Sequence, residues 1–174
     1  MSQIKVDSIV PRGGLPSGAS GGIIQIKQTV RTSVFSESVG EGNESSVVLP
    51  VTITPQSASN KILVYATVMM ALNTTHGRVF SLKRGSTSIC IGDADGSRRR
   101  RTGGGSSGNS SAPTVVTMLF LDSPNTTSTL TYGVTLSHNE NGTLTTYLNR
   151  TDYDVDRASV SRHASTLTVM EVSA

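Results

Sequence analysis

The chain has 174 residues, which is enough for one β-sandwich or jelly-roll domain and too few for two of ordinary size. Aromatic residues make up 4% of the chain and charged residues 16%, so the core must be built from aliphatic side chains and Thr, and the surface from uncharged polar ones. The net charge of +3 includes the run Arg98 to Arg101, so the chain has no broadly basic surface and nucleic-acid binding is not supported.

Targeting signals and cysteine chemistry are absent from the sequence. The N-terminus has no signal-peptide pattern, and no apolar stretch approaches the roughly 18 residues of a membrane span. We therefore expect a protein that is made in the cytoplasm and stays soluble. Cys90 is the single cysteine, which excludes an internal disulfide, and we expect it to be a small buried hydrophobic residue.

Residues 1–22 differ in composition from the rest of the chain and predict a docking arm followed by a hinge. The stretch IKVDSIV is apolar and partly alternating, yet it is too short to form a core of its own. It needs a partner surface, which favours strand addition or groove docking on another protein; a frayed chain end is the alternative. The arm residues are Ile4, Val6, Ile9 and Val10, and the hinge glycines are Gly13, Gly14, Gly18, Gly21 and Gly22.

From residue 23 onward the sequence predicts short strands separated by turn residues. In the first strand, Ile24, Ile26 and Val30 share one face, and Pro50 in the second should lie at an edge or a bulge. Gly85 and Ser86 predict a tight hairpin. The nine predicted strands are 23–31, 46–54, 61–72, 79–84, 87–92, 115–123, 129–137, 143–149 and 165–172.

Nine short strands without a helix indicate an all-β fold, a two-sheet sandwich of jelly-roll type that comprises residues 23–174. The longest apolar run, residues 61–72, is interpreted as its central strand because Val, Ile, Tyr and Thr favour strands. Residues 93–113 are polar throughout, so we expect a mobile surface loop there.

The residues that could carry chemistry do not form a recognisable site. Asp93 and Asp95 resemble the opening of a calcium loop, but the arginines that follow would repel a cation. The three histidines, at positions 76, 138 and 163, are expected at exposed loop positions without metal-ligand spacing. No catalytic or phosphate-binding motif is present. We therefore expect no enzyme activity, no cofactor and no metal.

The segment Arg98, Arg99, Arg100 and Arg101 is the candidate anion-contact loop, because guanidinium groups bind phosphates and carboxylates bidentately. Phosphate, an acidic glycan or carboxylates of a partner protein would all fit. A solvated loop is the alternative, since four consecutive arginines repel one another and the glycines that follow keep them mobile.

Four segments together resemble tail-fibre-like structural proteins of marine phages of the cyanophage type: the opening IKVDSIVPRGG, ITPQSASNKILV at 53–64, LKRGSTSICIGDADGSRRR at 82–100 and STLTVMEV at 165–172. The resemblance spans most of the chain. It implies a virion protein, a homotrimeric β-sandwich attached to the particle by its N-terminal segment. Here a full domain follows the starting Met without a shaft, unlike the longer fibres of that family.

The leading functional hypothesis is a short tail-associated appendage of a bacteriophage virion whose arm docks on a tail or collar protein. Its outer loops would meet the host surface, including surface glycans. One alternative is a capsid decoration protein, whose arm would lie across capsid subunits. Another is a carbohydrate-binding module, because jelly rolls also serve as lectins and the fold alone does not decide the function.

Overall fold

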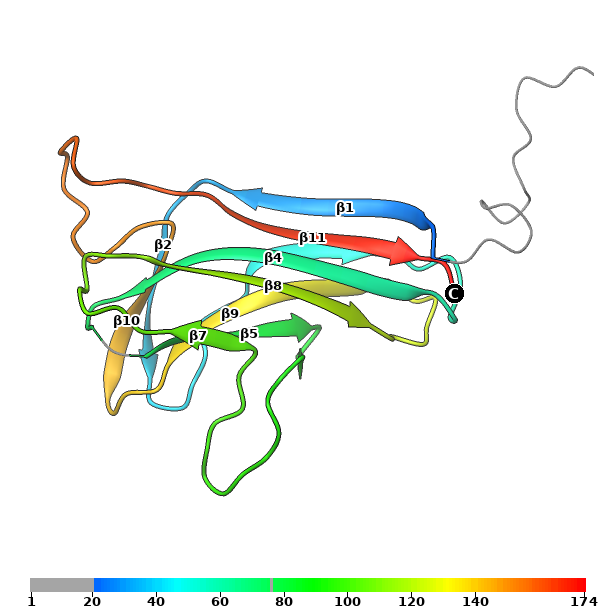
Figure 1. The fold of residues 1–174 in the computed structure, drawn as a ribbon, viewed down its shortest axis with the longest axis horizontal. Helices are drawn as coiled ribbons and strands as arrows, with labels where there is room; N and C mark the ends of the chain where they lie inside the picture. The colour runs from blue at the N-terminus through cyan, green and yellow to red at the C-terminus, as the bar shows by residue number, and fades with distance from the viewer. Residues whose placement is uncertain (1–20, 76) are drawn as a thin grey trace, which may run out of the picture.

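The computed structural model describes residues 21–75 and 77–174, which form eleven β-strands and no helix. The predicted all-β fold is confirmed (Figure 1). The strands are β1 (Ile23–Arg31), β2 (Phe35–Gly40), β3 (Val48–Ile53), β4 (Lys61–Leu72), β5 (Arg78–Arg84), β6 (Thr87–Ile89), β7 (Gly103–Gly105), β8 (Thr114–Asp122), β9 (Leu130–His138), β10 (Thr143–Leu148) and β11 (Ser165–Val172).

The strands form two antiparallel sheets whose order is that of a jelly roll. The six-stranded sheet runs β1-β11-β4-β10-β2 with β8 on the other edge of β4, and the five-stranded sheet runs β3-β9-β5-β6 with β7 also on β5. When β1 and β2 are counted as one interrupted strand, and β10 and β11 as another, the six-stranded sheet has the order β1/β2, β10/β11, β4, β8. The five-stranded sheet has the order β3, β9, β5, followed by the short β6 and β7. This division of the strands between two sheets is that of the two Greek keys of a jelly roll. The predicted jelly-roll sandwich is therefore confirmed.

The interruption in the six-stranded sheet is closed by two buried polar residues. β4 pairs with β11 up to Thr67 and with β10 from Met70 onward. Between them, the Met69 N–H donates to Ser165 Oγ at 2.9 Å, and the Met69 carbonyl accepts from the Asn149 N–H at 2.9 Å. The Asn149 side-chain amide also donates to the carbonyls of Arg31 and Ser33, at the break between β1 and β2. These bonds replace the ladder bonds that the interruption removes.

Aliphatic side chains from both sheets fill the space between them. Alternate residues of β4 point inward, and the inward residues of β5, β9 and β11 meet them. The central position predicted for residues 61–72 is confirmed. Buried core members are Ile62, Val64, Ala66, Val68, Met70, Phe80, Leu82, Tyr132, Val134, Leu136, Leu167 and Val169.

Two local predictions are confirmed by the strand pairing. β5 and β6 form a hairpin in which Arg84 pairs with Thr87 and Gly85 has a positive φ of 58°. Pro50 lies in edge strand β3, where the register shifts between Val48 and Val51. A proline fits there because no ladder hydrogen bond is required of it.

Other local predictions were wrong. β2 and β7 were not predicted, because FSESVG is half polar and the three glycines of β7 have no strand propensity. Each forms a strand because it pairs with a strand that is distant in the sequence, β2 with β10 and β7 with β5. The expected mobile loop 93–113 therefore contains a strand. In the first strand, Ile26 and Val30, which the alternation places on one face, are 56% and 54% exposed, so that face points outward.

Candidate functional site

The candidate anion-contact loop lies between β6 and β7 and projects beyond the sandwich (Figure 1). Arg98 forms an ion pair with Asp95 at 2.5 Å, with both side chains at least 70% exposed. Arg99 donates to Glu41 at 2.8 Å. These two arginines therefore already have carboxylate partners, and an external anion would have to compete with them.

The other two arginines of the loop are bound at its base, Arg100 within the loop and Arg101 to the body of the protein. Arg100 Nε donates to the Gly92 carbonyl at 2.6 Å. The Arg101 side chain is only 14% exposed and donates to Glu44 Oε1 at 2.7 Å. The alternative of a solvated run of arginines therefore does not fit Arg101, whose partner Glu44 was not recognised from the sequence.

Glu44 is the centre of a polar network on the outer face of the five-stranded sheet. Besides Arg101, it binds Lys83 at 2.5 Å and accepts from the hydroxyls of Ser81 and Thr135. Burial alone would raise the pKa of Glu44, but these hydrogen bonds and the positive charge of Lys83 together lower it. The residue is missed by sequence reasoning because its partners are 37 to 91 positions away.

A second cluster, Arg84–Asp122–Tyr132, connects the two sheets. Arg84 Nη1 lies 2.8 Å from both oxygens of Asp122, and the Tyr132 hydroxyl donates to Asp122 Oδ2 at 2.6 Å. Burial, and then the hydrogen bond and charge of Asp122, raise the pKa of Tyr132. Every member has a partner inside the protein, which indicates a structural role.

The segment between β10 and β11, residues 149–164, forms an excursion at the end of the sandwich opposite the C-terminus (Figure 1). The His163 N–H donates to the Asn149 carbonyl at 3.0 Å and so joins the two ends of the excursion. Inside it, Asp154 accepts from Arg162 at 2.9 Å and lies 3.5 Å from Arg150. The hydrogen bond from Arg162, against a smaller burial effect, lowers the pKa of Asp154.

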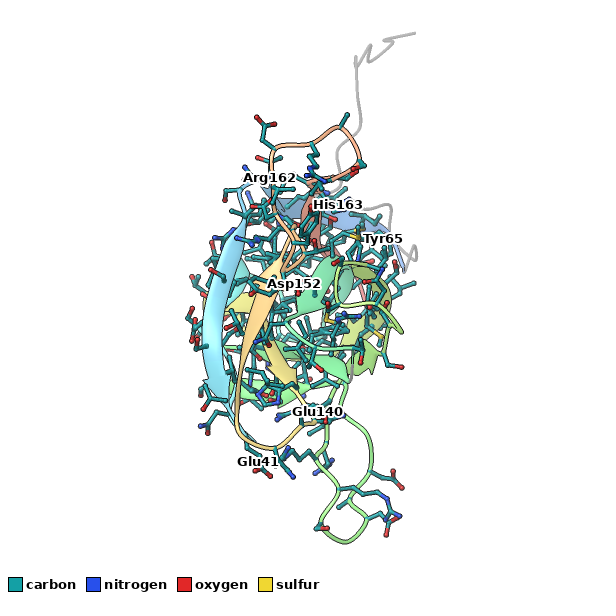
Figure 2. The ribbon with its side chains drawn as sticks, turned by 90° about the vertical axis from the view of Figure 1, so that its left-hand side faces the viewer. Glu41, Tyr65, Glu140, Asp152, Arg162 and His163 are labelled. Atoms are coloured by element: carbon teal, nitrogen blue, oxygen red, sulfur yellow. The ribbon has the colours of Figure 1, made fainter. Side chains whose placement is uncertain are left out.

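Two open hollows border this excursion. Figure 2 shows the end of the sandwich that carries the excursion, with Asp152, Arg162 and His163 labelled. One hollow, of about 560 Å³, is lined by residues 154–157, 160 and 162. The other, of about 370 Å³, is lined by Asn109, Ser111, Pro113, Thr151, Tyr153, Ser159, Val160, Ser161 and His163. Its amide, hydroxyl and imidazole groups with one exposed tyrosine can offer hydrogen bonds and a stacking face to a polar ligand.

The histidines and the cysteine differ from what the sequence indicates. His138 is fully buried, not exposed, and its Nε2 lies 2.8 Å from the Val39 carbonyl. His163 is half-buried, and His76 lies outside the described residues. Cys90 is half-buried with a φ of 52°, so the expected buried hydrophobic role is wrong; burial still raises its thiol pKa.

Metal and membrane sites are not found in the described residues. Within 21–75 and 77–174, no three His, Cys, Asp or Glu side chains are grouped so that they could hold a metal ion. Asp93 and Asp95 of the apparent calcium pattern are both exposed, and Asp95 is paired with Arg98. The described chain contains no helix that could cross a membrane.

The predicted arm residues Ile4, Val6, Ile9 and Val10 lie outside the described residues, as do the hinge glycines Gly13, Gly14 and Gly18. The last two hinge glycines are described. The Gly21 N–H donates to the Ser173 carbonyl, and the Ser173 N–H donates to the Gly22 carbonyl, each at 3.0 Å. This end of the predicted hinge is therefore bound to the C-terminal segment of the sandwich.

Sequence reasoning also missed the outer face of the six-stranded sheet, which is apolar over β8 and the adjoining part of β4. Leu119 and Leu121 of β8 are 61% and 52% exposed, and Val115 and Tyr65 are exposed beside them. A signal was present in the stretch VVTMLFLD, where both alternating sets of residues are largely apolar. Such a strand is typical of one that is covered on both faces.

The described chain is thus an all-β jelly-roll module with open hollows at its surface. Its sequence matches no protein-family model, and no curated protein is significantly similar to it. Among solved structures, it is similar to a chain of the "Structure of infectious bursal disease virus Gx strain", with a TM-score of 0.41 and 8% identity. That alignment covers 97% of this chain and 46% of the viral one, and the TM-score is too low to support a statement about role.

Proposed function

We propose that the chain is a structural protein of a bacteriophage virion, a short tail-associated appendage anchored by its N-terminal arm. The observation that carries the proposal is the placement of the two ends of the module. The pairing of Gly21 and Gly22 with Ser173 fixes the start of the sandwich at one end, and the excursion 149–164 lies at the other (Figure 1). A module attached at one end and presenting loops at the other suits an appendage.

Two further features support this role. The four segments that resemble marine-phage tail-fibre-like proteins supply the assignment to a virion. The carboxylates of Glu44 and Asp122 are held by internal partners, which suits a structural role for these two clusters. The hollow beside Tyr153 and His163 is the surface that we assign to contact with a host glycan.

Deletion of residues 2–20 tests the anchoring role and leaves Gly21 and Gly22 in place to pair with Ser173. We expect the shortened protein to remain folded but to be absent from particles. Mutant phage purified by density gradient and probed with an antibody would show this. Normal incorporation of the shortened protein would refute the proposal.

The number of copies per virion separates the appendage from a capsid decoration protein. Quantitative mass spectrometry of purified particles should give a few to a few tens of copies for a tail appendage, whereas hundreds would indicate the capsid lattice.

The glycan contact is tested separately: Tyr153→Ala should weaken binding of purified protein to host polysaccharide, with Val155→Ala as the control.

A further inference from the structure

The outer face of the six-stranded sheet has the character of a buried interface. Its residues align in rows across four strands, because the register pairs outward residues with outward residues. One row is entirely apolar: Ile26 of β1, Met170 of β11, Leu63 of β4 and Leu121 of β8. Such a continuous apolar row on a sheet face marks an interaction surface.

The neighbouring rows extend this surface along the strands with uncharged apolar and polar side chains. The second row pairs Gln28, Thr168, Tyr65 and Leu119, and Gln28 Nε2 donates to Thr168 Oγ1 at 2.7 Å. The third contains Val30 followed by three threonines, 166, 67 and 117. None of these rows contains a charged side chain.

The two faces of the sandwich contrast sharply in polarity. The outer face of the five-stranded sheet carries Lys83, Ser81 and Thr135 around Glu44, and that network is completed by residues of this chain. On the six-stranded sheet, by comparison, Leu119, Val115, Ile26 and Val30 are each more than half exposed. An uncovered apolar face of this kind, next to the edge strand β8, is prone to association.

We propose that this outer face is the surface through which copies of this chain associate. Electrical neutrality of the three rows favours a second copy, because uncharged rows meet the same rows of another copy without like-charge repulsion; Lys61, paired with Val172, lies beyond them at the end of β4. Size favours it too. Four strands about 4.8 Å apart and about eight residues long cover roughly 500 Å² in projection. Because side chains project from this plane, the accessible area is larger than its projection and increases toward the value of about 800 Å² that each partner buries in a standard interface.

The test is the mass of the full-length protein in solution, measured by light scattering after size exclusion at micromolar concentrations. The wild-type chain should have at least twice the monomer mass of 18.2 kDa. Leu119→Lys places a charge in the middle row of the face, on its β8 side, and should raise the dissociation constant by at least about 100-fold, or about 2.8 kcal/mol. The matched control is Val155→Lys, at an exposed valine of the β10–β11 excursion.

A second variant, Ile26→Lys, places the same charge on β1, so the test does not depend on whether Leu119→Lys folds. Circular dichroism and the thermal midpoint verify that each variant keeps its fold. Dissociation of either folded face variant, with the control still associated, supports the proposal. A monomeric wild type, or an oligomer that survives both face substitutions, overturns it. The proposal does not depend on the virion role.

Discussion

Replacing Asp122 with Ala should lower the free energy of unfolding by about 2–4 kcal/mol. The substitution leaves the fully buried Tyr132 hydroxyl without its acceptor, which costs about 1–3 kcal/mol. It also removes the ion pair of Arg84, whose side chain is 28% exposed and can regain water, so that loss is worth about 1 kcal/mol. Urea unfolding followed by circular dichroism would measure the change.

A double-mutant cycle isolates the hydroxyl. Tyr132→Phe added to Asp122→Ala should recover part of the loss, because the unsatisfied buried donor is then gone. Asp95→Ala is the matched control, since its ion pair with Arg98 is exposed and should contribute less than about 1 kcal/mol. If Asp122→Ala and Asp95→Ala cost the same, or if the double variant is the sum of the single ones, the reasoning is refuted.

Three further predictions concern single positions. Hydrogen bonds to the buried Glu171 carboxylate outweigh the effect of burial and lower its pKa, so the carboxylate stabilises the fold above about pH 4.5 and this stabilisation is lost as the pH falls through the lowered pKa. Glu171→Gln should therefore flatten the acid side of the curve of stability against pH, measured by thermal unfolding. An unchanged slope would contradict this. Asn149→Ala should cost about 2–4 kcal/mol in urea unfolding, because the fully buried amide closes the sheet interruption, and a cost below about 1 kcal/mol would mean that the sheet closes without it. Gly104→Ala should cost about 1–3 kcal/mol, because its Cβ would lie 2.5 Å from the Arg78 carbonyl oxygen, while Gly108→Ala has open space and should be near neutral; equal effects would refute this account.

The strands with strong β-branched content were predictable from the sequence. Residues 61–72 were placed in the centre, the hairpin at Gly85 was found, and Pro50 was assigned to an edge or bulge, because each depends on backbone preferences of neighbouring residues. β2 and β7 could not be found this way, since their sequences have weak preference and pairing partners far along the chain supply the stabilisation.

The candidate site was less predictable than the fold. Periodicity shows that Ile26 and Val30 share a face, but only the packing of β3 beneath β1 and β11 shows that this face points outward. The arginine run was visible in the sequence, whereas its neutralisation by Glu41 and Glu44 was not. Charge pairing between loops depends on how the sheets bring distant segments together, which local sequence does not encode.

The all-β jelly-roll class follows from the amino-acid sequence alone, because alternation, turn residues and the lack of helical periodicity are local properties. Which apolar residues are left uncovered depends on how the two sheets pack. Leu119 and Phe120 are neighbours of similar hydrophobicity on β8, yet Phe120 packs against the core and Leu119 is 61% exposed. Which face of a strand points inward is set by the opposing sheet. The apolar outer face can therefore be recognised only when both sheets are in place.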